Sequence, residues 1–240
     1  MLELKNISFR VEDGNSKKEI IKNVSFKIEE NSFVVVTGPN GGGKSTIAKI
    51  ITGIEKPTEG QILYKNEDIT QLSITERARK GIGFAFQQPV KFKGLTVFDM
   101  LSLAANKTLN TEEACAYLSE VGLCARDYVY REINSSLSGG ELKRIEIAML
   151  IARGTMLSVF DEPEAGIDLW SFKNLIRVFQ KMREHTGGTI VIISHQERIL
   201  DIADKIIVLA NGGVQNIGTR DEILPELLKH SNTCRFYKEV

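Results

Sequence analysis

The segment Gly38–Thr46 carries the residue types that could bind the phosphates of a nucleotide. It contains the pattern Gly-x-x-x-x-Gly-Lys-Ser, whose glycines let backbone N–H groups turn toward phosphate oxygens. In this pattern Lys44 reaches the β- and γ-phosphates, and the hydroxyl of Ser45 is a ligand of Mg²⁺. The segment therefore predicts a phosphate site made by Asn40, Gly41, Gly42, Gly43, Lys44, Ser45 and Thr46.

The flanking residues position this loop. Residues 33–36 form a continuous apolar run, which is typical of a buried parallel strand. Residues 47–51 have helical spacing, so a helix N-terminus with positive partial charge would face the phosphates. A glycine-rich turn alone would be weak evidence, but strand, loop and helix are in register here.

A pair of carboxylates follows a second apolar run. Residues 156–160 predict a short strand, and Asp161 and Glu162 come directly after it. Such pairs are often only a solvated turn. After a buried strand in a chain with a phosphate loop, Asp161 is predicted to hold the Mg²⁺ shell and Glu162 to polarise the attacking water.

A helix N-terminus with two glycines lies about a hundred residues after the phosphate loop. Leu137 to Glu141 reads Leu-Ser-Gly-Gly-Glu, and a helical pattern continues to residue 151. By itself Ser-Gly-Gly-Glu is a helix cap. Beside the phosphate loop it resembles the signature of ATP-binding cassette (ABC) ATPases, usually Leu-Ser-Gly-Gly-Gln, from which Glu141 departs. The resemblance implies an ATPase that uses ATP and Mg²⁺.

The same resemblance implies a dimer with shared sites. In that family the signature helix points at the γ-phosphate held by the opposite subunit, which suits an exposed helix N-terminus. The signature residues Ser138, Gly139, Gly140 and Glu141 would then act in trans, in an ATP-dependent homodimer. Residues 165–168 read Ala-Gly-Ile-Asp and are similar to the D-loop, usually Ser-Ala-Leu-Asp; Asp168 at their end would reach across the interface.

Two further residues match family positions after strand signals. Gln87 follows Phe84-Ala85-Phe86 and resembles the Q-loop glutamine, which senses water and Mg²⁺ and joins Ser45 and Asp161 at the metal. Gln88 is its competitor, but register favours Gln87. His195 follows the apolar run 189–193. A lone histidine there is more often a structural hydrogen-bonder, but the resemblance implies contact with the γ-phosphate.

One expected feature is missing. Many ABC ATPases stack adenine on an aromatic residue upstream of the phosphate loop, and here Val11 stands at that position. Phe9 could substitute, but it alternates with Ile7 and so is predicted to face a core. Weak base stacking follows, which puts base selectivity in doubt.

The composition is that of a soluble enzyme. The chain has 240 residues, with 31 Lys and Arg balanced by 31 Asp and Glu, so no global field favours nucleic acid. No apolar run reaches membrane-spanning length, which predicts no direct membrane insertion. The three cysteines have unmatched spacings and predict free thiols in a cytoplasmic protein.

The periodicities predict a single α/β domain of the ABC type over 1–240. We expect a P-loop NTPase fold with a mixed sheet core, an antiparallel β subdomain and a small helical lobe. The predicted parts are a catalytic lobe (1–86 and 137–220), a helical lobe (87–136) and a C-terminal helix (221–240).

Local signals place the remaining elements. Residues 1–30 alternate as an antiparallel sheet with a hairpin around 13–15, and Asn211-Gly212 predicts a second hairpin between strands 205–209 and 213–217. Helices are expected over 97–105 and 112–121, the latter capped by Asn110 or Thr111. The basic run 77–80 is interpreted as a solvated helix face.

Within the ABC class the sequence resembles the Suf iron–sulfur assembly ATPases (SufC). The Glu-ended signature and the missing adenine aromatic both fit this branch. The resemblance implies soluble SufB- or SufD-like scaffold proteins as partners, docking at a groove around residues 87–95 beside Lys91 and Lys93. It rests on five segments: 11–13, 38–41, 85–90, 138–144 and 166–168, with His195 and 198–201 following.

Three other functions remain to be distinguished. The ATP-binding subunit of a membrane transporter shares all of this chemistry and differs only in its partner, a permease. A chromosome- or repair-associated ATPase would need a long coiled-coil insertion that the chain lacks. A non-catalytic nucleotide-dependent scaffold conflicts with the intact Lys44, Glu162 and His195.

Overall fold

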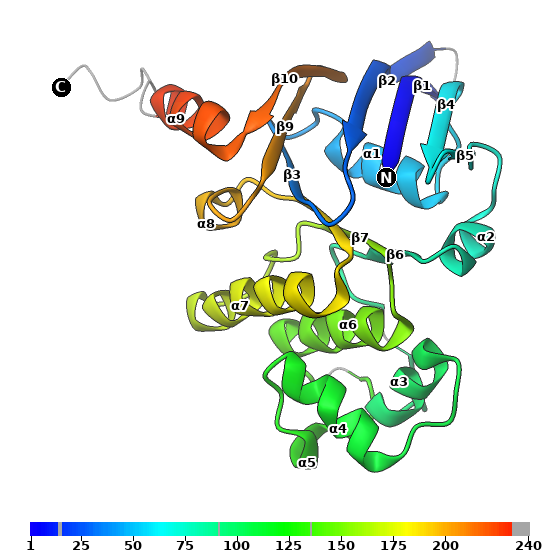
Figure 1. Ribbon diagram of the computed structural model, residues 1–240, viewed down its shortest axis with the longest axis vertical. Coiled ribbons are helices and arrows are strands. Elements are labelled where there is room, and N and C mark those ends of the chain that lie inside the picture. Colours follow the sequence, from blue (N-terminus) through cyan, green and yellow to red (C-terminus); the bar gives the residue numbers. More distant parts are fainter. Residues whose placement is uncertain (14–15, 91, 135, 232–240) are drawn as a thin grey trace.

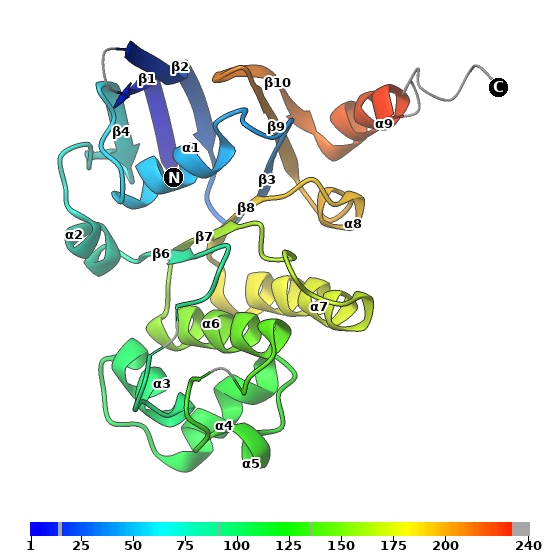
Figure 2. The ribbon, with the colours of Figure 1, turned by 180° about the vertical axis from the view of Figure 1, so that it is seen from behind.

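Two sheets and a set of helices make up the computed structural model, which describes residues 1–13, 16–90, 92–134 and 136–231 (Figures 1 and 2). The smaller sheet has the strand order β2-β1-β4-β5, and every pair in it is antiparallel. The expected antiparallel β subdomain is therefore confirmed. Residues 14–15 of the expected hairpin lie outside the described residues. The strands are β1 (Leu2–Asp13), β2 (Ser16–Ile28), β4 (Glu59–Tyr64) and β5 (Glu67–Asp68).

The larger sheet has six strands in the order β10-β9-β3-β8-β7-β6. All neighbouring pairs are parallel except β9 and β10, so the sheet is mixed, as expected. Because the strands run in parallel, β3, β6, β7 and β8 all end at one edge of the sheet. The strands are β3 (Phe33–Thr37), β6 (Ile82–Ala85), β7 (Leu157–Asp161), β8 (Thr189–Ile193), β9 (Lys205–Ala210) and β10 (Gly213–Thr219).

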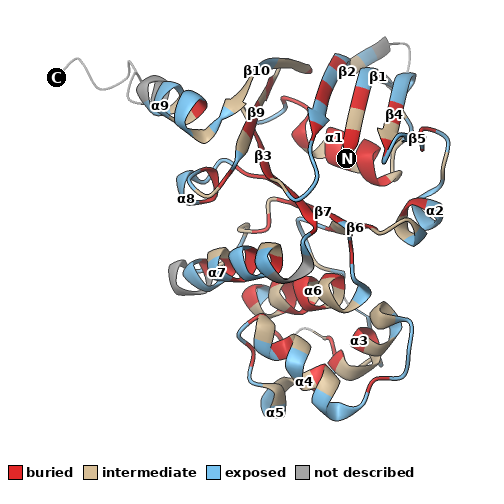
Figure 3. Ribbon diagram, in the orientation of Figure 1, coloured by how far each residue is buried: buried red, intermediate tan, exposed pale blue. Residues whose placement is uncertain are grey.

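The central strand β3 is buried on both faces, which explains its continuous apolar run (Figure 3). Phe33 and Val35 belong to the core shared with the helical side of the molecule. Val34 and Val36 belong to the core between the two sheets. The helix after the phosphate loop, α1 (Lys44–Thr52), packs its apolar side chains into this second core.

Helices α3 to α7 gather on one side of the larger sheet, away from α1 (Figure 1). Helices α3 and α4 pack against α6, which in turn packs on α7 and β6. The expected helix 97–105 is confirmed, and its neighbour begins at Thr111, one residue early, with Asn110 as its cap. The helices are α3 (Val97–Ala105), α4 (Thr111–Glu120), α5 (Ala125–Tyr128), α6 (Gly139–Arg153) and α7 (Leu169–Thr186).

The C-terminal part contains the second hairpin. Asn211 and Gly212 both have positive φ, 54° and 80°, as a two-residue type I′ turn requires, so the predicted hairpin is confirmed. The short helix α8 (Glu197–Leu200) precedes it, and α9 (Arg220–Ser231) follows. Among the described residues, no helix is both long and apolar enough to cross a membrane.

The interpretation of residues 77–80 as a solvated helix face is wrong for Arg77, which lies on α2 (Ile74–Arg79) and is fully buried. Its guanidinium donates to the carbonyls of Ile50 and Ile51, at 2.6 and 2.9 Å, at the end of α1. It also donates to the carbonyls of Thr70 and Leu72. Helix C-termini leave carbonyls unpaired, and Arg77 supplies the missing donors. Burial lowers the pKa of Arg77 to about 10.

Candidate nucleotide site

The phosphate loop joins the end of β3 to the start of α1. Helices α2, α3, α4 and α6 each begin with a complete capping box, but the N-cap residue of α1 is Gly43, which has no side chain to cap the helix. Its first N–H groups are therefore left to a ligand, as an anion site requires. Gly38 has φ 134°, and a Cβ there would lie 2.0 Å from the carbonyl oxygen of Leu209, so only glycine fits.

Lys44 lies across this loop. Its ammonium donates to the carbonyls of Gly38 and Pro39, at 2.8 and 3.0 Å, and its side chain is buried. These carbonyls hold the charge over the loop, where the β- and γ-phosphates are expected.

Two side-chain pairs connect the loop and the carboxylates at the sheet edge. Ser45 donates from Oγ to Oδ1 of Asp161 at 2.9 Å, and Gln87 donates from Nε2 to Oε2 of Glu162 at 2.6 Å. Burial raises the pKa of Asp161, and the hydrogen bond from Ser45 opposes that rise. The arrangement brings together predicted residues from α1, from the end of β7 and from the segments that follow β6 and β7. Gln87, rather than Gln88, contacts Glu162.

This donor set fits Mg²⁺. The ion prefers oxygen ligands and usually takes one or two from protein side chains, together with phosphates and water. Ser45, Asp161 and the Gln87 amide offer such oxygens. Within the described ranges, no cluster of three or more His, Cys, Asp or Glu could hold a metal by itself, so the metal prediction depends on a bound nucleotide.

Glu162 has an unusual backbone conformation. Its φ is 44°, which a non-glycine residue adopts at a cost of about 1–3 kcal/mol. The N–H of Glu162 donates to the carbonyl of Ile193 at 3.0 Å, which ties β7 to β8 at this position. Strain of this kind gathers at functional sites, because the surrounding structure holds the side chain in one direction.

A cleft of about 670 Å³ lies over the phosphate loop. Its lining includes most of the predicted phosphate-site residues together with Gln87 and Glu162, but not Gly42. Sequence reasoning missed its opposite wall, because long-range pairing places β2 and the β9–β10 turn there; the N–H of Lys22 donates to the carbonyl of Gly212. The missed lining residues are Lys18, Glu19, Ile20, Lys22, Asn211 and Gly212.

The described lining of this cleft contains no aromatic side chain. Val11 is exposed and does not line the cleft, while Phe9 packs against the core between the sheets, as predicted. Weak stacking of the nucleotide base therefore stays a prediction.

His195 stands on the loop after β8, and its exposed side chain does not line the cleft. The residues on either side of it are fixed. Ser194 donates to the Glu164 carboxylate at 2.5 Å, and the N–H of Gln196 donates to the Ser194 hydroxyl at 3.0 Å. Burial raises the pKa of Glu164. The turn after Glu162 thus holds the backbone that carries His195.

The signature segment caps its own helix. The Ser138 hydroxyl accepts from the N–H of Glu141, and the Glu141 carboxylate accepts from the N–H of Ser138 and from the hydroxyl of Tyr128. A Cβ on Gly139 would lie 3.5 Å from the carbonyl oxygen of Gly166, so signature and D-loop are neighbours within the chain. None of Ser138–Glu141 lines the cleft with Lys44, and Asp168 is exposed.

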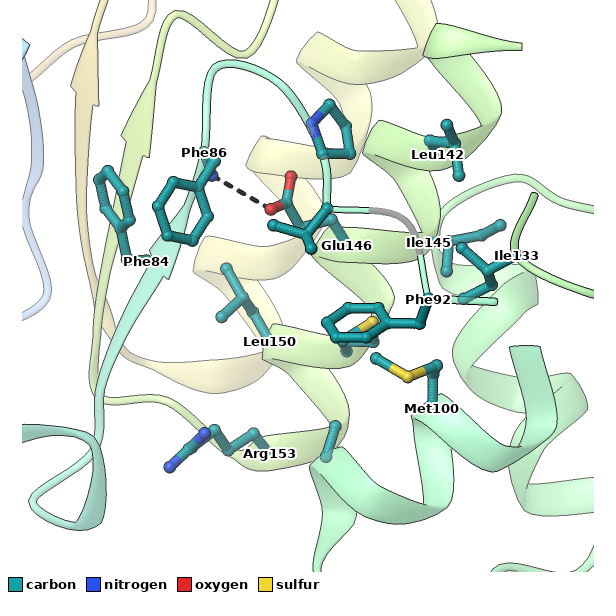
Figure 4. A pocket seen from close by; sticks show the side chains of 14 residues that line it. Phe84, Phe86, Phe92, Met100, Ile133, Leu142, Ile145, Glu146, Leu150 and Arg153 are labelled. Atoms are coloured by element: carbon teal, nitrogen blue, oxygen red, sulfur yellow. Dashed lines mark hydrogen bonds between the residues drawn. The ribbon is translucent and has the colours of Figure 1, made fainter. Parts of the chain in front are cut away.

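An apolar pocket lies beside the Q-loop (Figure 4). Its walls come from the segment after β6, from α3 and from α6. Lys91 lies outside the described residues, and Lys93 is exposed and does not line the pocket. Cys115 and Cys124 are free thiols, as predicted, while Cys234 lies outside the described residues.

Comparison with known proteins finds relatives that are named as ATP-binding proteins, in agreement with a nucleotide site. A family model described as ABC transporter matches residues 21–165. An uncharacterised ABC transporter ATP-binding protein from Methanocaldococcus jannaschii is 38% identical, over 99% of this chain and 96% of its own length. A spermidine/putrescine import ATP-binding protein from Mycoplasma mycoides is 33% identical over 94% of this chain, which spans 63% of that relative.

The fold also matches solved structures. A dimeric ATP-binding cassette in a post-hydrolysis state, bound to ADP and Pi, has a TM-score of 0.83 and 28% identity. The match covers 92% of this chain and 99% of that one.

Proposed function

Because the chain belongs to the ABC family of ATP-hydrolysing domains, we propose that it is the ATP-binding subunit of a membrane transporter. The observation that carries the ATP-hydrolysing part of the proposal is the joining of Ser45 to Asp161 and of Gln87 to Glu162 at the carboxyl edge of the sheet. The choice of a membrane partner is supported by the relatives instead. The names of its relatives, which are transporter subunits, support a permease as the partner over the Suf scaffold expected from the sequence.

The residues of the site divide the work of hydrolysis. Lys44 and the uncapped start of α1 hold the phosphates, and Ser45, Asp161 and Gln87 offer ligands to Mg²⁺. The ion, when bound, neutralises phosphate charge. Glu162 orients the attacking water, and its bond from Gln87 keeps the carboxylate directed toward the cleft. His195 contacts the γ-phosphate when its exposed side chain turns toward the nucleotide, because the backbone that carries it is held in place.

Two copies complete the sites in this proposal. The signature residues lie outside the cleft of their own chain, so Ser138 and Gly140 would serve the nucleotide of a second copy. ATP then favours the closed dimer by binding it more tightly than the open form. Asp168 would cross the same interface.

A soluble Suf scaffold is the second candidate partner. It is favoured by Glu141, which replaces the usual glutamine of the signature, and by Val11 at the position of the adenine aromatic. A SufB- or SufD-like protein would dock at the groove around residues 87–95.

Affinity purification from the native cell, with membrane and soluble fractions kept apart, separates the two partners. We expect the chain to be recovered from the membrane fraction with a multi-spanning protein that raises its ATPase rate. Recovery of a soluble scaffold alone, with no integral membrane protein, would overturn the transporter proposal and favour the second candidate.

A further inference from the structure

The apolar pocket beside the Q-loop opens onto exposed apolar side chains. Phe86, Val90 and Phe92 are 38%, 51% and 40% exposed, and all three line it. Figure 4 shows Phe84 and Phe86 on one wall, and Phe92 and Met100 on the other. Contiguous apolar surface of this kind is typical of a protein interaction site.

A carboxylate lies inside this apolar pocket. Glu146, on α6, stands between the two walls, and its Oε1 accepts from the N–H of Phe86 at 3.1 Å (Figure 4). Its Oε2 is buried without a hydrogen-bond partner among the residues that the structure describes. Lys143, whose positive charge attracts this carboxylate, instead donates to the carbonyl of Phe86 at 2.7 Å.

The unpaired carboxylate oxygen indicates the chemistry of the group that binds in the pocket. A buried carboxylate is costly unless hydrogen-bonded donors surround it, and the Phe86 N–H satisfies only one oxygen. An apolar segment alone would leave this cost in place. We propose that the pocket binds a partner segment with an apolar face and a single Lys or Arg, whose charged group pairs with Glu146.

This inference rests on the proposed function, since it specifies the chemistry of the docking partner. It also gives the partner a route to the nucleotide. Lys143 and Glu146 hold the two backbone groups of Phe86, and the next residue, Gln87, contacts Glu162. A cation drawn to Glu146 would therefore act directly on the segment that positions Gln87.

Two matched small probes test the chemistry without the partner. Cyclohexylmethylamine is a cation with an apolar body, and cyclohexylmethanol is its neutral analogue. Each is titrated at pH 8 into the ¹⁵N-labelled full chain, and the amide resonance of Phe86 reports binding. The variants are Glu146→Gln and a control, Glu112→Gln, an exposed residue on α4 that does not line the pocket.

We expect the wild type and the control to bind the amine roughly tenfold more tightly than the alcohol. In Glu146→Gln the ratio should fall to about one, while alcohol binding demonstrates that the pocket is intact. If the wild type and Glu146→Gln show the same ratio of amine to alcohol affinity, the proposed pairing of a cation with Glu146 is wrong, although the pocket still binds apolar groups. Failure of both probes to shift Phe86 would overturn the pocket itself. Neither result depends on which partner is purified. The transporter proposal is therefore tested separately, by the affinity purification.

Discussion

Glu162 is the residue whose geometry has the clearest chemical meaning. Its backbone is strained, its N–H is tied to β8, and its carboxylate is held by Gln87. A side chain fixed in this way suits a group that must orient one water molecule.

We expect Glu162→Gln to bind ATP but to lose hydrolysis by about a hundredfold or more, because the amide cannot polarise water. With ATP the variant should accumulate as a closed dimer in size-exclusion chromatography. Nucleotide binding is measured separately, by equilibrium titration. If this variant hydrolyses ATP at the wild-type rate, another group must orient the attacking water.

Glu146 should make stability depend on pH. Burial raises its pKa to about 7, while the attraction of Lys143 opposes the rise. The folded state thus keeps this proton when the unfolded chain has lost it, so the stabilisation is full below the ordinary pKa and disappears as pH rises through 7. The unfolding free energy of Glu146→Gln minus that of the wild type should therefore increase by on the order of 2–3 kcal/mol between pH 5 and pH 8, because only the wild type loses stability over this range.

Denaturant unfolding at several pH values measures this gain. Glu112→Gln is the control, because its exposed side chain loses little hydration on folding. A stability difference between Glu146→Gln and wild type that does not change with pH would contradict the prediction.

At the scale of elements, Arg77 secures the end of the phosphate-loop helix. Its guanidinium joins the last turn of α1 to the segment before α2, through four backbone carbonyls. The position of α1 therefore depends on a side chain far from the nucleotide.

Arg77→Met should lower the unfolding free energy by on the order of 3 kcal/mol or more, because buried carbonyls lose their donors. Arg79→Met removes the same charge from an exposed position on the same helix and should cost little. Equal effects in chemical denaturation would show that the buried hydrogen bonds contribute nothing.

Arg77 also illustrates where sequence reasoning succeeds and fails. The phosphate loop, the strands beside it and the Asn211–Gly212 hairpin follow from local periodicity and turn chemistry, and they were predictable. The burial of Arg77 and the cleft wall from β2 depend on partners distant in sequence. The 18-residue helix α7 was also not predicted.

At the scale of the whole molecule, the proposed function assigns one chain two separated halves of a site. Lys44 lies in the cleft, while Ser138, the N-cap residue of α6, lies outside that cleft. The D-loop accompanies the signature through the contact of Gly139 with Gly166. This division accounts for the expected dependence of hydrolysis on a second copy.

Mixing two inactive variants tests the central claim most directly. Lys44→Ala removes the phosphate contact, and Ser138→Arg blocks the signature, so each homodimer should be inactive. Their heterodimer retains one intact composite site, so a random mixture should recover up to about one quarter of wild-type ATPase activity. Each variant mixed with itself is the control. A mixture that forms heterodimers, measured by tagged pull-down, and still shows no ATPase activity would contradict the account.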